Sequence, residues 1–177
     1  MLDLPSTSQA PTLTFELTQR QKEVRDVFAS AAKYFLIYGG SRSGKTFLTI
    51  YTILTRMIKA PGSRHVVFRN DGIDAKQSIG NETIPAVIKL AYPTLALKWH
   101  DQDGYYEAPN GAQLWLAGLK DKARLDKVLG KEFCTIYLNE ASQITLEAFS
   151  VVQTRLAQVV MQTNGKRLPL RLYVDLN

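Results

Sequence analysis

The sequence contains a single cysteine, Cys134, among 177 residues. One thiol cannot form a disulfide within the chain, which favours a reducing intracellular compartment. Cys134 lies in an apolar run, so we expect it in the core rather than as a nucleophile. Hydrophobic runs are too short to cross a bilayer, and residues 1–11 lack the basic and hydrophobic segments of a secretory signal. We therefore expect no membrane partner.

Metal-binding clusters, internal repeats and low-complexity blocks are also missing from the sequence. His65 and His100 have no partners at the spacing of metal ligands. The 177 residues, 45% of them hydrophobic, suffice for one domain with a sizeable core. The formal net charge of +6 suits a polyanionic partner. We expect residues 1–16, rich in Ser, Thr and Pro, to form a flexible arm and residues 17–177 to form the domain.

The run Gly39-Gly40-Ser41-Arg42-Ser43-Gly44-Lys45-Thr46 fits the phosphate-binding pattern G-x-x-x-x-G-K-[ST]. Its glycines let successive backbone N–H groups point at phosphate oxygens. Lys45 supplies a positive charge for the β- and γ-phosphates, and the Thr46 hydroxyl can ligate Mg²⁺. A strand over residues 34–38 precedes the loop, and a helical apolar pattern follows it until Pro61-Gly62. This order places the positive helix N-terminus on the phosphates, and it predicts a nucleotide site.

Strands alternate with helices along the rest of the sequence. We expect helices over 18–31, 74–90 (with a break near Pro85) and 145–160, strands over 65–69, 133–138 and 170–174, and a hairpin at Pro109-Asn110-Gly111 joining 95–106 to 112–117. The alternation predicts an α/β fold with a mainly parallel sheet flanked by helices. Ligands bind at the carboxyl ends of strands in such sheets, so the P-loop, Asn139-Glu140 and 175–177 should converge on one site.

Asn139 and Glu140 directly follow the apolar run Thr135-Ile136-Tyr137-Leu138. A nucleotide hydrolase needs a strand end of this kind, where one residue orients the Mg²⁺ shell and a carboxylate activates water. We assign Glu140 as general base and Asn139, with Thr46, to the metal. Position 139 would commonly be Asp, and Asn can accept a hydrogen bond from a metal-bound water but brings no charge. The alternative for Glu140 is a solvated carboxylate.

Four motifs together resemble the ATPase domain of a large terminase subunit, the DNA-packaging motor of tailed bacteriophages. They are Leu17-Thr18-Gln19-Arg20-Gln21, the P-loop, Tyr137-Leu138-Asn139-Glu140-Ala141-Ser142 and Asp175-Leu176-Asn177, and they span residue 17 to the end of the sequence. The arginine inside the loop and the Asn-Glu-Ala-Ser strand end carry most of the likeness. The resemblance implies a P-loop NTPase fold of the RecA-like, additional-strand type, ATP and Mg²⁺ as ligands, and ATP hydrolysis that moves double-stranded DNA.

The resemblance also assigns roles to individual residues. Arg42 would sense or act on the γ-phosphate, and Gln21 would contact the adenine; for Gln21 the alternative is a capping box with Thr18. Asp175-Leu176-Asn177 resembles the motif that couples hydrolysis to movement. Nucleotide contacts are expected from Gln21, Gly39, Gly40, Ser41, Arg42, Ser43, Gly44, Lys45, Thr46 and Phe47, and catalytic roles from Arg42, Lys45, Arg124 and Glu140.

Residues 120–131 hold five basic side chains against two acidic ones. Such a run is usually solvated, and the alternative is a segment that faces DNA or a neighbouring subunit. In ring motors a neighbour can supply an arginine finger that stabilises the transition state. Arg124 is our candidate because it shortly precedes the Glu140 strand, and Arg155 is the second choice.

The sequence thus predicts an ATP-hydrolysing motor domain of a viral terminase. By resemblance its partners would be double-stranded DNA, the portal protein, the small terminase subunit and further copies in a homo-oligomeric ring, in the host cell cytoplasm. The terminase nuclease domain and the last part of the motor are not expected within these residues. The alternatives are a RecA-like helicase or translocase domain and a nucleotide-dependent binding switch with little turnover.

Overall fold

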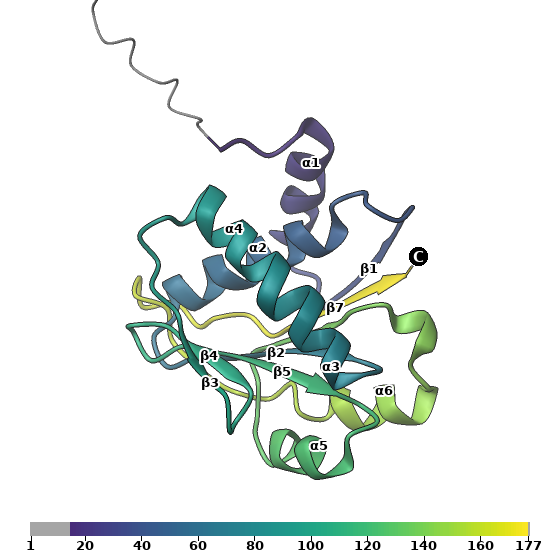
Figure 1. Ribbon diagram of the computed structural model, residues 1–177. Coiled ribbons are helices and arrows are strands. Elements are labelled where there is room, and N and C mark those ends of the chain that lie inside the picture. The colour runs from purple at the N-terminus through teal and green to yellow at the C-terminus, as the bar shows by residue number, and fades with distance from the viewer. Residues whose placement is uncertain (1–14, 177) are drawn as a thin grey trace, which may run out of the picture.

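The computed structural model describes residues 15–176, without the side chains of residues 122–124. Its centre is a seven-stranded sheet of order β1-β7-β6-β2-β5-β4-β3 (Figure 1). The strands are β1 (Tyr34–Tyr38), β2 (Arg64–Arg69), β3 (Lys98–His100), β4 (Tyr105–Glu107), β5 (Gln113–Gly118), β6 (Thr135–Leu138) and β7 (Arg171–Leu176). The pairs from β1 to β5 are parallel, whereas β5-β4-β3 is antiparallel. The expected mainly parallel α/β fold is therefore confirmed.

Helices cover both faces of the sheet (Figure 1). They are α1 (Gln19–Phe28), α2 (Lys45–Lys59), α3 (Gly72–Asp74), a π-helix (Ala75–Thr83), α4 (Ile84–Ala91), α5 (Lys122–Leu129), a 3₁₀ turn (Ala141–Gln143) and α6 (Leu146–Gln153). Of the described helices, none is long and apolar enough to span a membrane.

Alternating side chains along the parallel strands build one core on each face. Along β2, Val67 packs into the core under α2 and α4, while Val66 and Phe68 pack into the core under α5 and α6. Cys134 is completely buried, as its apolar context predicts. Strands β2, β6 and β7 are thus fixed in the middle of the molecule, which holds their carboxyl ends in place.

Two expected elements differ from the structure. The helix expected over 145–160 ends at Gln153, and Val159, expected inward, is 64% exposed. The reason is a long-range pairing: Phe133 N donates to Arg155 O, and Ala157 N donates to Phe133 O, so the chain here follows Phe133 instead of its own helix. That pairing also delays the regular part of β6 to Thr135.

The break expected near Pro85 is instead a π-helix that precedes this proline. Pro85 lies in the first turn of α4, where its missing N–H costs no hydrogen bond. The Gly80 carbonyl within the π-helix accepts a hydrogen bond from the Tyr106 hydroxyl at 3.1 Å, and Gly80 packs against Leu116 of β5. These contacts with the sheet favour the wider helical turn over a simple kink.

The hairpin expected at Asn110-Gly111 joins β4 to β5. The segment before it, expected as one strand, is two short strands joined by a turn that ends at Gly104, whose φ is +79°. Aromatic rings pack across these strands: Trp99 lies 4.7 Å from Tyr106, and Tyr105 lies 4.5 Å from Trp115, between ring centroids. The aromatic side chains of the hairpin therefore serve packing between strands.

Candidate functional site

The carboxyl ends of β1, β6 and β7 meet at one cavity of about 240 Å³. Its lining residues are Ser41, Arg42, Ser43, Gly44, Lys45, Thr46, Phe47, Asn139, Glu140 and Asp175. The convergence follows from the strand register, because Leu138 of β6 pairs with Val174 of β7, which pairs with Leu36 of β1. The structure therefore brings together the P-loop, the Asn139-Glu140 strand end and the first residue of the third motif.

The P-loop takes a backbone conformation that most residues avoid. Gly39 and Gly44 have φ values of +156° and +82°, and Arg42 has φ +60° although it carries a side chain. A non-glycine residue in the left-handed region costs about 1–3 kcal/mol and is concentrated at functional sites. Helix α2 begins directly after Gly44, so the N–H groups of its first turn face the loop. This is the geometry of an anion site at a helix N-terminus.

The Lys45 side chain folds back over the loop. Its Nζ donates to Gly39 O at 2.6 Å and to Gly40 O at 2.9 Å. The two carbonyls hold the ammonium group at the cavity lined by the loop, where a phosphate would meet it. The Arg42 side chain is exposed.

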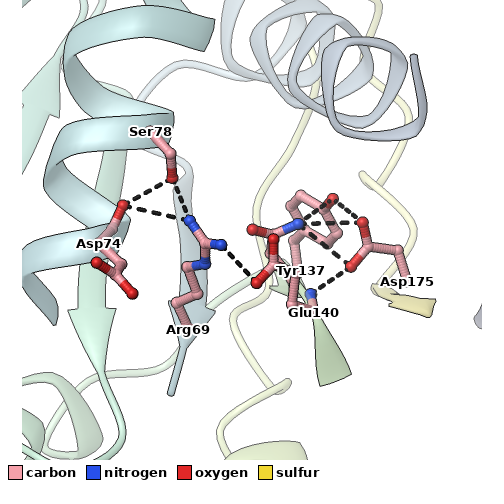
Figure 2. A network of polar contacts seen from close by, with 7 residues as sticks. Arg69, Asp74, Ser78, Tyr137, Glu140 and Asp175 are labelled. Atoms are coloured by element: carbon pink, nitrogen blue, oxygen red, sulfur yellow. Dashed lines mark hydrogen bonds and ion pairs between the residues drawn. The ribbon is translucent and has the colours of Figure 1, made fainter. Parts of the chain in front are cut away.

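Glu140 is the second non-glycine residue with a left-handed backbone, at φ +54°. Its Oε2 forms an ion pair with Nη2 of Arg69 at 2.5 Å. Arg69 is itself anchored, because its Nη1 donates to Asp74 O at 3.4 Å and to Oγ of Ser78 (Figure 2). Arg69 ends β2, the strand next to β6, so the carboxylate expected as general base is bound to the π-helix through one arginine.

Asp175 is surrounded by donors on the other side of Glu140 (Figure 2). The Tyr137 hydroxyl donates to Oδ2 at 2.9 Å, and Glu140 N donates to Oδ1 at 2.5 Å. Asn139 Nδ2 lies 3.2 Å from Oδ1 and 3.0 Å from Oδ2, and it also donates to the Tyr137 hydroxyl. The Asp175 carboxylate, 2% exposed, is therefore held in one orientation.

Burial dominates the ionisation of this group of residues. Burial raises the pKa of Asp175, against the donors from Glu140, Tyr137 and Asn139 and the charge of Lys45. The pKa of Tyr137 is raised well above its ordinary value by burial and by the charge of Asp175, while the Thr46 side chain acts in the opposite direction. Tyr137 thus stays a hydroxyl that donates to Asp175.

Gln21 lies beside the P-loop and completes the capping box of α1. Its Oε1 accepts from Thr18 N at 3.0 Å, and its own N donates to Thr18 Oγ1 at 3.3 Å. A Cβ at Gly44 would come within 3.0 Å of Gln21 Nε2. The local alternative for Gln21 is thus present in the structure, and the contact with adenine remains a prediction.

Two other candidates stand apart from the described cavity. Arg124 belongs to α5, but its side chain lies outside the described residues, as does all of Asn177. Arg155 donates from Nη1 to Leu129 O at 3.1 Å, which ties the end of α6 to the end of α5. This contact gives Arg155 a structural role within the domain.

Arg69 and Tyr137 are polar members of the site that the sequence analysis did not identify. Arg69 follows a buried strand, which places it at the correct edge of the sheet. Its partner depends on β2 lying next to β6, and no local pattern gives that order. Tyr137 has the signal of a polar group within an apolar strand, which we read as core packing alone.

The oxygen donors at the cavity fit Mg²⁺ bound together with a nucleotide. Within residues 15–176 no group of three or more His, Cys, Asp or Glu could hold a metal by itself. Mg²⁺ usually takes one or two protein oxygens and completes its shell with phosphates and water. The Thr46 hydroxyl and the Asp175 carboxylate both line the cavity and offer such a donor set.

Solved structures with the same fold are large terminases. The large terminase of a thermophilic bacteriophage matches with a TM-score of 0.74 and 15% identity, over 92% of this chain and 39% of that one. The ATPase domain of the Thermus phage P74-26 large terminase matches with a TM-score of 0.59 and 14% identity, over 92% and 66%. The large terminase of bacteriophage HK97 matches with a TM-score of 0.64 and 15% identity, over 92% and 33%. The chain thus spans about two fifths of the first relative.

At these identities the solved structures establish the fold, and they confirm the expected architecture. No curated protein matches the chain. A family model described as "Terminase large subunit, T4likevirus-type, N-terminal" matches residues 36–159. Because this match covers well over half of the chain, the chain belongs to the terminase large-subunit family, in its N-terminal part.

Proposed function

We propose that the chain is the ATP-hydrolysing domain of a viral DNA-packaging motor. The observation that carries the proposal is the single cavity shared by the P-loop and Glu140. A solved relative is described in complex with ADP and in complex with ATP-gamma-S, which supports a nucleotide as the ligand. The two left-handed residues at this cavity, Arg42 and Glu140, fit a site where backbone strain is kept for function.

The residues of the cavity divide the reaction between them. The loop N–H groups and Lys45 bind the phosphates, and Arg42 reaches the γ-phosphate from the exposed rim. Glu140 takes the proton of a water that attacks the γ-phosphorus, the bond to the bridging oxygen breaks, and ADP and phosphate leave. Bound Mg²⁺ would neutralise charge on the β- and γ-phosphate oxygens. Loss of phosphate then moves an element coupled to the site.

The partners in this proposal follow from the family rather than from the cavity. They are double-stranded DNA, the portal protein, the small terminase subunit and further copies of the chain in a ring, acting in the host cell cytoplasm. The net charge of +6 supports a polyanionic partner. A ring would also allow Arg124 of one copy to reach the nucleotide of the next.

The test of the proposal is ATP hydrolysis with and without double-stranded DNA, for the unaltered chain and for Glu140→Gln. Loss of a general base should lower kcat about 10²- to 10⁴-fold, while nucleotide affinity stays within a few fold. Glu147→Gln is the matched control, because Glu147 is an exposed carboxylate on α6. Hydrolysis that is equally fast in Glu140→Gln would refute the catalytic assignment.

The ion pair between Arg69 and Glu140 favours a second candidate function, a nucleotide-dependent switch with little turnover. Arg69 occupies the carboxylate oxygen that a water would otherwise approach. The two functions separate in the assembled full-length motor. Nucleotide that changes DNA affinity there without being hydrolysed would support the switch.

A further inference from the structure

Asn139 leaves the metal side of the cavity without the negative charge that a strand end usually supplies. Glu140, the next residue, is already paired with Arg69. Asp175 is the remaining carboxylate among the lining residues, and it lies on β7, the strand next to β6. The question is whether its position allows it to replace the missing charge.

Strand register places Asn139 and Asp175 side by side. Leu138 pairs with Val174 across the parallel strands, so the next residues on each strand, Asn139 and Asp175, are neighbours in the following row. Their side chains touch, with Nδ2 of Asn139 3.0 Å from Oδ2 of Asp175. A carboxylate at either position therefore reaches the same part of the cavity, near Thr46.

Charge repulsion allows only one carboxylate in this pair. Two carboxylates about 3 Å apart cannot both ionise, because each raises the pKa of the other. An amide beside a carboxylate donates a hydrogen bond and keeps the negative charge on one residue. Asn139 also shares the Tyr137 hydroxyl with Asp175, so one network holds both side chains.

We propose that Asp175 supplies the protein carboxylate of the Mg²⁺ site and that Asn139 is a positioning residue that orients it. This inference rests on the proposed nucleotide function. Its substance is that the charge stands on the strand next to the one that carries Glu140. Thr46 provides the hydroxyl, and Asp175 holds the hydration shell or an inner oxygen position.

The test measures binding, not turnover. A fluorescent ADP analogue is titrated in Mg²⁺ and again in EDTA, and the ratio of the two dissociation constants reports the metal site. For Asp175→Asn we expect the affinity in EDTA to be retained and the Mg²⁺ effect to fall about 10- to 100-fold, the range for loss of a residue that supports a metal. Asp126→Asn, an exposed carboxylate on α5, is the matched control and should change neither.

The exchanged variant, Asn139→Asp with Asp175→Asn, is the stronger arm and covers the case in which Asp175→Asn fails to fold. It returns one carboxylate and one amide to the same row, so the Mg²⁺ effect should return to within a few fold. Persistence of the full Mg²⁺ effect in Asp175→Asn would overturn the inference, as would a folded exchanged variant without it. Absence of nucleotide binding by the unaltered chain even in Mg²⁺ would overturn the proposed function and this inference together.

Discussion

The ion pair between Arg69 and Glu140 should couple the stability of two segments far apart in sequence. The perturbation is a double-mutant cycle of Arg69→Met, Glu140→Gln and the double variant. Methionine keeps most of the apolar stem of Arg69, and glutamine keeps the shape of Glu140, so each change removes mainly charge. The cycle then isolates the pairwise free energy from the cost of each single change.

The magnitude follows from burial and from anchoring. Exposed ion pairs contribute about 0.2–1 kcal/mol, whereas residues in one polar network couple by about 0.5–3 kcal/mol. The Arg69 and Glu140 side chains are 15% and 29% exposed, with 2.5 Å between the charged atoms. Ser78 and Asp74 hold the guanidinium in place, which lowers the entropy cost of pairing. We therefore expect about 1–2 kcal/mol of coupling.

The assay is urea unfolding followed by circular dichroism, with the m-value checked for constancy across the four proteins. The control cycle uses Lys76 and Asp101, a pair at 2.7 Å whose side chains are 44% and 75% exposed, and should give about 0.5 kcal/mol or less. Coupling between Arg69 and Glu140 of less than about 0.3 kcal/mol would show that solvent screens the pair and refute the reasoning from burial.

Three further predictions concern other parts of the molecule. Burial lowers the pKa of His65 well below its ordinary value, so the unfolded chain binds the extra proton: unfolding free energy should fall, by up to about 1.4 kcal/mol per pH unit, as pH drops below about 6.5, and His65→Asn should flatten that slope in urea titrations. Gly118→Ala should destabilise the fold by about 1–3 kcal/mol or more in the same assay, since its Cβ would lie 2.2 Å from the Gly72 backbone nitrogen; a stability change near zero would contradict this packing. In assembled full-length motors, mixing Arg124→Ala with Glu140→Gln subunits should restore part of the ATPase activity if Arg124 acts across an interface, and rings without recovery would exclude that role.

Local patterns predicted the parts of the fold that depend on neighbouring residues. The strand over residues 34–38 and the P-loop depend on a short run of side chains and on glycines, and the strand has the expected bounds. The hairpin turn at Asn110-Gly111 is local in the same sense. Its Gly111 has φ +76°, a conformation that glycine adopts without strain.

Long-range contacts account for the parts that the sequence did not predict. The end of α6 depends on Phe133, which lies about twenty residues earlier and takes the backbone hydrogen bonds of residues 155–157. The π-helix depends on Tyr106 and Leu116 from other strands. Periodicity describes which face of a helix is apolar, but it does not report where a distant strand will compete for its backbone.

The same limit applies to the candidate site, where adjacency across the sheet decides which side chains meet. Residues 69, 139 and 175 each follow a residue of one register row, Phe68–Leu138–Val174, on three neighbouring strands. The sequence predicted that strand ends would converge, and it identified Glu140 and Asn139 one at a time. It could not place Arg69 beside Glu140, because that contact depends on the order of β2 and β6.

A register row is therefore a better unit than a sequence position for judging whether the site is complete. Judged alone, Asn139 lacks the charge that a metal needs. Judged with its neighbour on β7, the row contains one buried carboxylate, oriented by an amide, a hydroxyl and a backbone N–H. Because β7 lies between β6 and the P-loop strand β1, a carboxylate on β7 stands closer in the sheet to the phosphates than one on β6 would. Moving the charge by one strand thus keeps it within the site, and an asparagine at position 139 is not by itself evidence against hydrolysis.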